Sequence, residues 1–368
     1  MKILLTNFRS PWDPLAGGGQ AATDELARAL VARGHAVTAV FGGEPAPVNP
    51  PYTVAWVTPS TRPVVAALRI ARRVRALADD IEPDVIHASG FEGAFLPRGR
   101  VRAMTTHHPD LPPWAPPSWA SPCSRVRYFR WNQVAWMERE GLRKADVAFF
   151  VSAAARDRAA ARGYGTSRPR VVPNGVDVAA FSPASDRETT DAPTVMFAGR
   201  MDDQKGVDVL LRAASCLSPR TKLRLAGGGW KEAEYRRLAA ELGLGETVEF
   251  LGQVPRTELP GLLRSASVVA VPSRYENLPL SVLEGMACGV AVVASRVGGV
   301  PEMMDDGVEG TLVPPEDPEA LGAALARLLG DRDLAARMGA AGRRRVLTEF
   351  TWDSVAGRIE AAYADLLS

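Results

Sequence analysis

Short apolar runs alternate with helical patterns along this 368-residue chain, and this alternation constrains its fold more than any other feature. Such alternation is typical of parallel β-sheets covered by helices on both faces, because each parallel connection needs a crossover segment. In the first half, the expected strands are residues 2–8, 36–41, 53–57, 85–88, 102–106 and 147–151. The expected helices between them are residues 21–32, 64–78 and 126–143.

The same alternation restarts in the second half, with expected strands at 194–198, 222–226, 248–251, 268–271, 291–294 and 311–313. The expected helices there are residues 206–217, 231–242, 259–265, 280–288 and 318–329. A segment rich in Pro, Asp, Ser and Thr, residues 173–193, separates the halves. We therefore expect an α/β protein of two doubly wound, Rossmann-like domains, because a chain of this length exceeds one ordinary core. The expected domains are residues 1–172 and 173–351, with the amphipathic helix 352–368 packing back onto the first.

One segment of the expected second domain, residues 273–289, carries two carboxylates, Glu276 and Glu284, on either side of Pro279. Proline suits the first position of a helix, since its missing N–H would be unpaired there anyway. Glu276 is therefore expected on the loop before a helix, and Glu284 on the helix itself. The free N–H groups of a helix start, with the positive end of its dipole, favour a phosphate. Two carboxylates that bind hydroxyl groups around a phosphate site suit a sugar nucleotide.

Two cations, Arg200 and Lys205, follow the first expected strand of the second domain. Ligands of doubly wound sheets bind at the carboxyl ends of strands, so a cleft between two facing domains is the expected active site. A diphosphate suits these cations, because negative charge builds on its oxygens as a sugar–phosphate bond breaks. The alternative is a solvated basic loop. The presence of the carboxylate segment in the same domain favours the phosphate-binding interpretation over this alternative.

Glycines and histidines supply further candidate ligand contacts. Gly17, Gly18 and Gly19 lie between the first strand and the first helix, and Gly228 lies in a second run, 227–229, after a strand. Glycine lets a backbone approach a phosphate closely, although a plain flexible loop is the alternative. His107 and His108 follow the strand 102–106, where either can hydrogen-bond a sugar hydroxyl. A packed or surface histidine is the alternative there.

Several other functions find little support. The net charge of +2 argues against nucleic-acid binding, and no apolar run reaches the roughly 18–20 residues of a membrane span. Histidines and cysteines are too sparse for zinc, and we read Asp331 and Asp333, formally Asp-x-Asp, as a coincidence. The three scattered cysteines and the strand-like residues 1–5 favour free thiols in the cytoplasm. Tryptophans and arginines in residues 111–136, with four arginines in residues 64–78, suggest peripheral membrane association or a solvated face.

The carboxylate segment resembles the motif of retaining glycosyltransferases with the GT-B fold, in which seven residues separate two glutamates. The similar group is the large family of glycosyl transferases group 1, which includes sucrose synthase, bacterial glycogen synthases and phosphatidylinositol mannosyltransferases. Other matching segments occur in the family's order over nearly the whole chain. They are residues 172–177 (VPNGVD), 197–200 (FAGR) through Lys205-Gly206, 298–302 (GGVPE) and 350–353 (FTWD).

This resemblance implies a role for each matching residue. Arg200 and Lys205 would bind the donor diphosphate, Glu276 would hold hydroxyls of the donor sugar, and Glu284 would bind the ribose. The glycine loop at 17–19 would close over the phosphate from the other domain. His107 matches the family's first-domain histidine better than His108. The donor set implied is Gly17, Gly18, Gly19, Arg200, Lys205, Gly228, Glu276, Asn277, Leu278, Leu280 and Glu284, with His107, Arg200, Lys205 and Glu276 as catalytic residues.

The resemblance also implies the reaction. A hexosyl or N-acetylhexosaminyl group would move from a nucleoside-diphosphate sugar to an acceptor hydroxyl with retention, without metal or other cofactor. UDP is the first nucleotide expected and GDP the second, and the acceptor stays open among a glycolipid or saccharide, a small metabolite and a polysaccharide. A sugar-nucleotide epimerase and a non-catalytic sugar-nucleotide-binding protein are the alternatives. We expect a cytoplasmic monomer or homodimer, with peripheral membrane association as a further option.

Overall fold

The computed structural model describes residues 1–13, 17–43, 49–107, 122–184 and 192–368, without the side chains of 122–131. The chain divides into a first unit, Met1–Gly175 with Trp352–Ser368, and a second unit, Val176–Thr351. The sequence placed the first division after residue 172, whereas the first unit continues to Gly175. The reason is local packing, because a Cβ on Gly175 would lie 2.7 Å from the Trp352 ring of the same unit.

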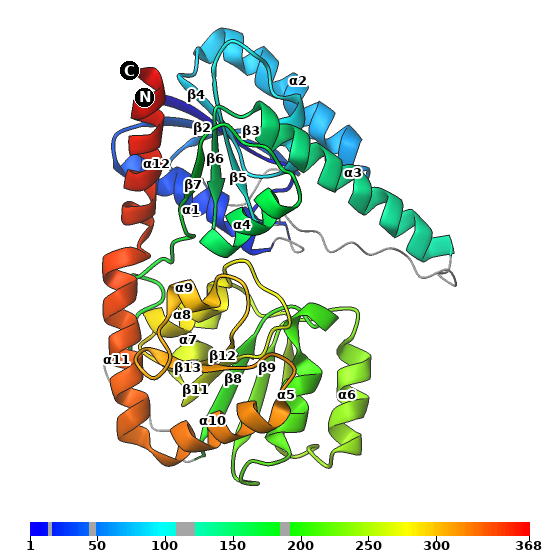
Figure 1. The fold of residues 1–368 in the computed structure, drawn as a ribbon, viewed down its shortest axis with the longest axis vertical. Helices are drawn as coiled ribbons and strands as arrows, with labels where there is room; N and C mark the ends of the chain where they lie inside the picture. Colours follow the sequence, from blue (N-terminus) through cyan, green and yellow to red (C-terminus); the bar gives the residue numbers. More distant parts are fainter. Residues whose placement is uncertain (14–16, 44–48, 108–121, 185–191) are drawn as a thin grey trace. The chain divides into compact units, whose positions relative to one another are not determined.

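The described part of the first unit is built on a seven-stranded parallel sheet in the order β3-β2-β1-β4-β5-β6-β7 (Figure 1). The order reverses between β1 and β4, the kind of switch point at which doubly wound sheets bind ligands. The strands are β1 Lys2–Asn7, β2 Ala36–Gly42, β3 Thr53–Val57, β4 Val85–Ala88, β5 Val101–Thr106, β6 Val147–Phe150 and β7 Pro169–Val171.

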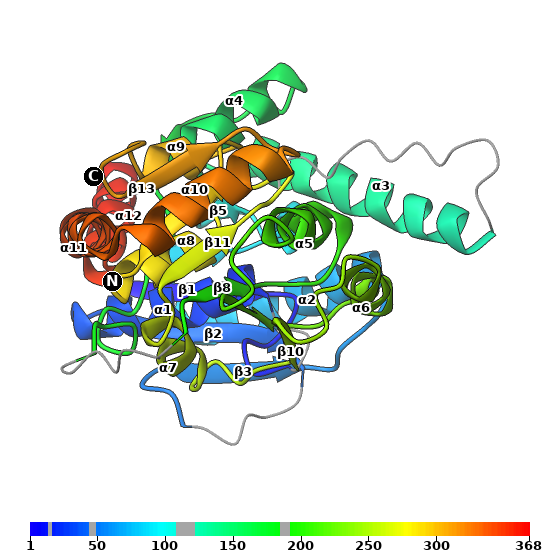
Figure 2. The same cartoon turned by 90° about the horizontal axis from the view of Figure 1, so that it is seen from below.

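Helices cover both faces of this sheet (Figure 2). They are α1 Gly18–Ala32, α2 Pro63–Ile81, α3 Pro122–Lys144, α4 Ala153–Ala161 and α12 Trp352–Leu367, with the 3-10 turn η1 Phe91–Phe95. One core joins α1 and α12 to alternate strand residues such as Ile3 and Leu5. The other joins α2, α3 and α4 to the intervening residues, such as Leu4. Because both faces are buried, apolar residues of the strands point to both faces rather than to one face alone.

The first unit departs from the sequence expectation in a few elements. Helix α1 begins at Gly18, so Gly18 and Gly19 belong to the helix and Gly17 is its N-cap. The loop predicted for these three glycines is therefore wrong for two of them. Strand β7 and helix α4 were not expected, because β7 has three residues and starts with proline, and α4 is short and rich in alanine.

The second unit contains a six-stranded parallel sheet in the order β10-β9-β8-β11-β12-β13 within the described residues. Its switch point lies between β8 and β11. The strands are β8 Thr194–Ala198, β9 Lys222–Ala226, β10 Val248–Gly252, β11 Val268–Val271, β12 Ala291–Ser295 and β13 Gly310–Val313. The helices are α5 Val207–Ala214, α6 Glu232–Glu241, α7 Leu259–Arg264, α8 Leu280–Ala287, α9 Val300–Met303, α10 Pro318–Gly330 and α11 Arg332–Glu349, with the 3-10 turn η2 Asp203–Lys205.

Helices α5, α6 and α10 pack on one face of this sheet, and α8 packs on the other against β11 and β12. A Cβ on Gly285 would lie 3.2 Å from methyl groups of Val269 and Val292, so this glycine lets α8 approach the sheet closely. Helices α9 and α11 were not expected as separate elements. Asp331 caps α11, because its Oδ1 accepts the Leu334 N–H at 2.8 Å, which gives this Asp-x-Asp aspartate a structural role.

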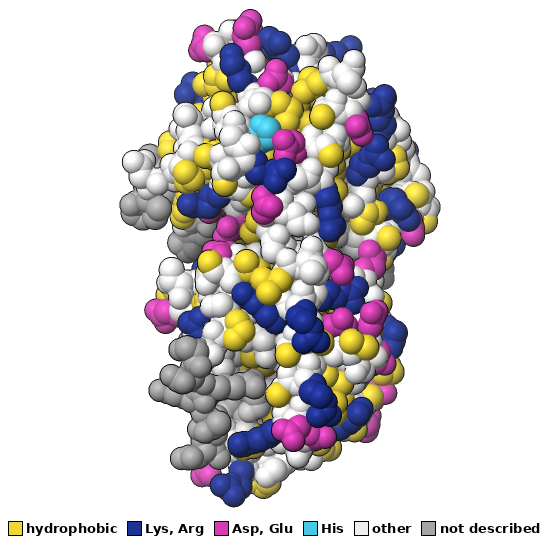
Figure 3. All heavy atoms as spheres, turned by 90° about the vertical axis from the view of Figure 1, so that its left-hand side faces the viewer, with side chains coloured by type: hydrophobic (Ala, Val, Ile, Leu, Met, Phe, Trp, Pro, Cys, Tyr) yellow, Lys and Arg dark blue, Asp and Glu magenta, His cyan; other side chains and the backbone are white. Residues whose placement is uncertain are grey.

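The surface carries charges of both signs. Lys and Arg side chains are interspersed with Asp and Glu side chains over the face drawn in Figure 3. Within the described ranges, every helix is too short or too polar to cross a bilayer. Cys216 and Cys288 are free thiols, and the side chain of Cys123 lies outside the described residues.

Candidate active site

The two predicted carboxylates lie at the carboxyl end of β11, beside the switch point of the second unit. Glu276 is on the loop that follows β11, and Glu284 is on α8, as the position of Pro279 indicated. Pro279 is the N-cap rather than the first helical residue, with extended backbone angles. Both glutamates are buried, at 5% and 4% exposure, so each negative charge needs a partner.

Lys205 is the partner of Glu276. Its Nζ lies 2.5 Å from Glu276 Oε1, and the Ser273 hydroxyl donates to the same oxygen at 2.7 Å. The two residues are 71 positions apart, and each follows one of the adjacent strands β8 and β11. The site predicted from separate motifs therefore brings this lysine and this carboxylate into direct contact.

Close backbone contacts hold the two loops together. Gly206 has φ +63°, and a Cβ there would lie 2.1 Å from the carbonyl oxygen of Pro272. Gln204 makes two hydrogen bonds to the loop that carries Glu276. Its carbonyl accepts the Arg274 N–H at 2.8 Å, and its side chain donates to the Tyr275 carbonyl at 3.0 Å. Glycine at 206 is thus required by the approach of the loops.

Arg274 is a residue of this site that sequence reasoning missed. Its guanidinium makes a bidentate pair with Asp208 at 2.9 and 2.7 Å, and donates to the Asp203 carbonyl at 2.9 Å and to Glu316 at 2.9 Å. Burial acts to raise the pKa of Asp208, but the hydrogen bond and charge of Arg274, together with backbone hydrogen bonds, outweigh it, and the pKa is lowered. Arg274 therefore ties the Glu276 loop to the turn that carries Lys205.

Arg200 has a more open position than Lys205. Its side chain is 65% exposed, and its Nη2 lies 3.0 Å from Asp202 Oδ2 and 3.1 Å from Gln204 Oε1. These contacts leave most of its guanidinium facing solvent at the carboxyl end of β8. An exposed guanidinium here can approach a diphosphate with little desolvation cost.

The loop after β12 packs against the backbone of the Glu276 loop. Gly298 has φ +52°, and a Cβ there would lie 1.7 Å from the carbonyl oxygen of Glu276. The Gly299 N–H donates to the Asn277 carbonyl at 3.1 Å. The match at residues 298–302 therefore reflects a backbone contact that admits only glycine. Leu278 is buried, and Leu280 opens α8, so both lie where the sequence expected them.

The second glycine run is explained mainly by packing. A Cβ on Gly227 would lie 1.9 Å from the Gly199 carbonyl oxygen, and one on Gly229 would lie 2.3 Å from the Met201 carbonyl oxygen. Gly228 differs, because its nearest neighbours would be side-chain atoms at 3.5 Å. Gly228 is therefore the member of this run with space for a ligand next to its Cα.

Glu284 has a partner that the sequence did not indicate. Arg256, in the segment between β10 and α7, places Nη1 2.9 Å from Glu284 Oε1. Burial raises the pKa of Glu284, and the charge and hydrogen bond of Arg256 oppose this rise. Glu284 is thus a buried carboxylate whose charge depends on an arginine.

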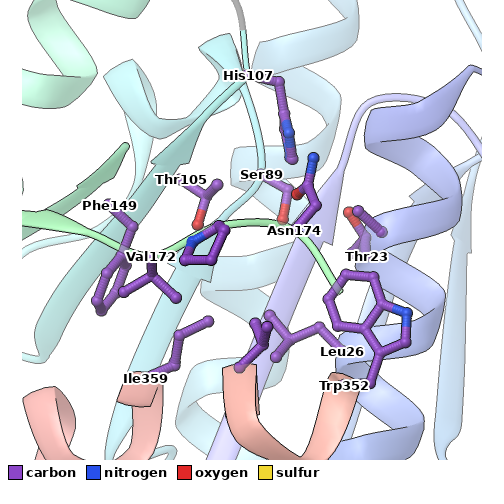
Figure 4. A pocket seen from close by; sticks show the side chains of 13 residues that line it. Thr23, Leu26, Ser89, Thr105, His107, Phe149, Val172, Asn174, Trp352 and Ile359 are labelled. Carbon is purple, nitrogen blue, oxygen red and sulfur yellow. The ribbon is translucent and has the colours of Figure 1, made fainter. Parts of the chain in front are cut away.

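In the first unit, His107 follows β5 beside α1. A Cβ on Gly19 would lie 3.3 Å from His107 Cδ2, so glycine makes room for this ring. Gly17 has no such neighbour, and its N–H donates to the Gln20 side chain at 2.9 Å. Figure 4 shows His107 close to Asn174 at a cavity of about 20 Å³, which holds roughly one water molecule. His108 lies outside the described residues, so the choice between the two histidines stays a prediction.

His87 is a structural residue of the first unit. It is fully buried, with Nε2 2.7 Å from Thr105 Oγ1 and Nδ1 2.5 Å from the hydroxyl of Tyr363 on α12. Burial lowers the pKa of His87 to about 3, so the ring is neutral at physiological pH. The neutral imidazole ties α12 to the first sheet.

The tryptophan-rich segment lies largely outside the described structure. Trp136 on α3 is exposed, with its ring 6.3 Å from that of Phe95. Arg69 on α2 donates to the carbonyls of Thr58 and Pro59, which gives this arginine a structural contact. Membrane association therefore stays a prediction. Among the described residues, no three His, Cys, Asp or Glu side chains gather as metal ligands would.

Comparison with known proteins places this architecture in a class. Residues 16–180 match the model of Glycosyltransferase Family 4, and residues 180–345 match the model of Glycosyl transferases group 1. A sucrose-phosphate synthase from Thermosynechococcus elongatus superposes with a TM-score of 0.83 at 27% identity, over 100% of this chain and 99% of that one. The glycosyltransferase WaaG superposes with a TM-score of 0.76 at 18% identity, over 100% and 99% of the chains, and so supports the fold alone. The fold is that of GT-B glycosyltransferases.

Curated relatives give the family. The MMP alpha-(1->4)-mannosyltransferase of Mycolicibacterium hassiacum is 30% identical over 99% of this chain and 98% of its own length. The GDP-mannose-dependent alpha-(1-6)-phosphatidylinositol monomannoside mannosyltransferase of Mycolicibacterium smegmatis is 36% identical over 64% of this chain and 68% of its own. The match to the D-inositol 3-phosphate glycosyltransferase of Corynebacterium jeikeium, 38% identical, spans 54% of this chain and about half of that protein, 52%. The chain belongs to the glycosyl transferases group 1 family, which confirms the family and the fold class predicted from its sequence.

Proposed function

We propose that this glycosyltransferase moves a glycosyl group from a nucleoside-diphosphate sugar to an acceptor hydroxyl, with retention at the anomeric carbon and without a metal ion. The observation that carries the proposal is the Lys205–Glu276 pair at the carboxyl ends of β8 and β11, in which the carboxylate is buried and the lysine is partly buried. Lys205 supplies positive charge for a diphosphate, and Glu276 supplies acceptor oxygens for sugar hydroxyls. A site with both groups in contact suits a ligand in which a sugar is bonded directly to a diphosphate.

The proposed reaction uses the leaving group as its base. As the bond between the anomeric carbon and the phosphate oxygen breaks, Lys205 and Arg200 stabilise the negative charge that develops on the diphosphate. The acceptor oxygen forms its bond to the anomeric carbon on the same face, and its proton passes to the departing phosphate oxygen. This route gives retention without a protein nucleophile. His107, in the first unit, would hold a sugar or acceptor hydroxyl.

The contacts of the site are compatible with this role. A lysine ammonium has three N–H donors, and Lys205 donates to one carboxylate oxygen of Glu276. Further donors of Lys205 can therefore bind phosphate while the pair persists. Glu276 in turn keeps acceptor capacity on its second oxygen for a sugar hydroxyl.

For the donor base, we propose UDP, with GDP as the alternative that the GDP-mannose-dependent relative favours. For the acceptor, the relatives act, by their names, on a phosphatidylinositol mannoside or an inositol phosphate. A polyhydroxylated acceptor, either a glycolipid or saccharide or a small metabolite, is the proposal for this chain. Peripheral membrane association and a monomeric or homodimeric state belong to the same proposal.

The test is a binding screen followed by a product assay. Purified protein is titrated with UDP, GDP, ADP and dTDP and then with their sugars, and one nucleotide is expected to raise the unfolding temperature. A ligand at 100 times its Kd adds about 2.7 kcal/mol to the stability of the folded state. Glycosylated product with release of the diphosphate supports transfer, an isomerised donor without acceptor reveals an epimerase, and binding without either reveals a sensor. Absence of binding to all four nucleotides would contradict the proposal.

Lys205→Ala is expected to weaken binding of the selected nucleoside diphosphate about tenfold to a hundredfold, because one charge-assisted hydrogen bond is lost. Calorimetric titration measures this change. Lys222→Ala is the matched control, since Lys222 is an exposed lysine of the same unit whose Nζ donates to the Glu246 carbonyl at 2.8 Å. Equal affinities of the two variants would show that the diphosphate binds elsewhere.

A further inference from the structure

Arg256 is the charged side chain that reaches the buried carboxylate of Glu284. The Glu284 side chain is 6% exposed, whereas that of Arg256 is 42% exposed, and the bond between Nη1 and Oε1 measures 2.9 Å. The guanidinium carbon of Arg256 also lies 5.4 Å from the centre of the ring of Phe181, and Phe181 is buried. The ring contact and the ion pair together hold the arginine in one orientation.

Other charged groups near α8 engage different atoms. Arg343 on α11 donates to the carbonyls of Phe181 and Ala287, at 2.8 and 2.9 Å. Arg264 on α7 donates to the Ala180 carbonyl at 3.4 Å. Cys288, at the end of α8, is a neutral thiol, because burial raises its pKa to about 12. Among the described residues, Arg256 donates the hydrogen bond to the Glu284 carboxylate.

A free carboxylate in this place would lose its charge readily. Burial disfavours the ionised form of Glu284 and raises its pKa, and the attraction of Arg256 opposes this rise. A carboxylate accepts hydrogen bonds at about four lone-pair positions, and Arg256 occupies one of them through Oε1. Room is left on the same group for two hydroxyl donors. Once protonated, the group would instead carry an O–H donor and accept fewer bonds.

We infer that Arg256 is a positioning residue for the donor nucleotide, which keeps Glu284 ionised and oriented so that it accepts both ribose hydroxyls. The inference rests on the proposed function, in which Glu284 binds the ribose. Arg256 and the ribose share the carboxylate, and the arginine keeps its bond while the nucleotide is bound. Removal of the Arg256 side chain is therefore expected to weaken the contact between Glu284 and the ribose and to make this contact depend more strongly on pH.

The test is calorimetric titration of Arg256→Met and of the unmodified protein with the nucleoside diphosphate that binds and with its 2′-deoxy analogue. In Arg256→Met, the pKa of Glu284 rises further, so the protonated form gains population as pH falls and ribose binding is lost in that direction. The expected loss of affinity is about tenfold at pH 8 and larger at pH 6. The nucleotide's own phosphate titration cancels in the ratio between the two proteins.

Discrimination against the 2′-deoxy analogue gives a second readout, which is expected to shrink in Arg256→Met at pH 6. Arg256→Lys is expected to restore most of the pH independence, because it returns a positive charge. Arg256→Gln, which keeps a polar but uncharged side chain, replaces the methionine variant if the latter fails to fold. Arg264→Met is the control, since this arginine lies on the adjacent α7 and binds a carbonyl instead of Glu284.

Two results would overturn the inference while leaving the proposed function intact. Unchanged affinity and unchanged 2′-deoxy discrimination in Arg256→Met at every pH would mean that Glu284 does not depend on Arg256. Tighter binding in Arg256→Met would mean that the arginine competes with ribose for the carboxylate. A failure of the proposed function looks different, because the unmodified protein would then bind none of the nucleotides.

Discussion

Glu276→Ala is expected to reduce glycosyl transfer by about a hundredfold or more while the protein stays folded, because an interaction with the transferred sugar is removed. The substitution also leaves Lys205 without its carboxylate partner at 2.5 Å. Removing one partner of a largely buried pair costs a few kcal/mol at most when the remaining group can reach solvent. Lys205 is 19% exposed, so we expect a moderate loss of stability rather than unfolding.

The measurement is the initial rate of product formation at saturating donor, with the unfolding temperature recorded alongside. Glu249→Ala is the matched control, since Glu249 also pairs with a basic side chain, Arg224 at 2.8 Å, in the same unit. Glu249 is 57% exposed and lies on β10, away from the Glu276 loop. Ordinary turnover by a folded Glu276→Ala variant would refute the assignment of this carboxylate to the donor sugar.

Gly298→Ala is expected to destabilise the second unit by about 3 kcal/mol or more, and to weaken nucleotide binding. The added Cβ would lie 1.7 Å from the Glu276 carbonyl oxygen, so the Glu276 loop or the loop after β12 has to move. The backbone φ of +52° adds strain of about 1 kcal/mol, and overpacking of this kind costs about 1–3 kcal/mol. The loop that moves carries the proposed sugar-binding carboxylate, so stability and binding are expected to fall together.

Gly307→Ala separates the strain from the clash. Gly307 has φ +81°, but a Cβ there would meet no atom within 4 Å. This control is expected to lose only about 1 kcal/mol, and to bind nucleotide normally. Urea unfolding, fitted with separate transitions for the two units where they occur, measures both variants. Equal loss of stability in Gly298→Ala and Gly307→Ala would show that the close contact with Glu276 is absent.

Long, regular elements were predictable from the sequence because their pattern is local. Strands such as Thr53–Val57, Thr194–Ala198 and Val268–Val271 have the bounds that the sequence predicted, and the helix Trp352–Leu367 ends one residue before its predicted end. Short elements were not, since β7 has three residues and α9 has four, too few for a periodic pattern to develop. The Asp331 cap of α11 was likewise not predicted, because a capping bond depends on a helix that the sequence had not separated.

In the candidate site, too, the sequence predicted some residues and missed others. The carboxylates and cations were found from motif spacing, but their partners lie far along the chain. Arg274 pairs with Asp208, 66 positions away, and Arg256 pairs with Glu284, 28 positions away. Such pairs depend on how the strands are ordered in the sheet and how the segments after them pack, and no local pattern encodes that.

By itself, the sequence determined the alternation of buried strands and amphipathic helices, the family and the residue types available for a diphosphate and a sugar. Only the tertiary structure decided that Lys205 and Glu276 share one buried contact, that Gly298 must lack a side chain, and that Arg256 supports Glu284. The physical reason is distance. Periodicity and helix capping act within a few residues, whereas desolvation, ion pairing and steric exclusion act between atoms that the fold brings together.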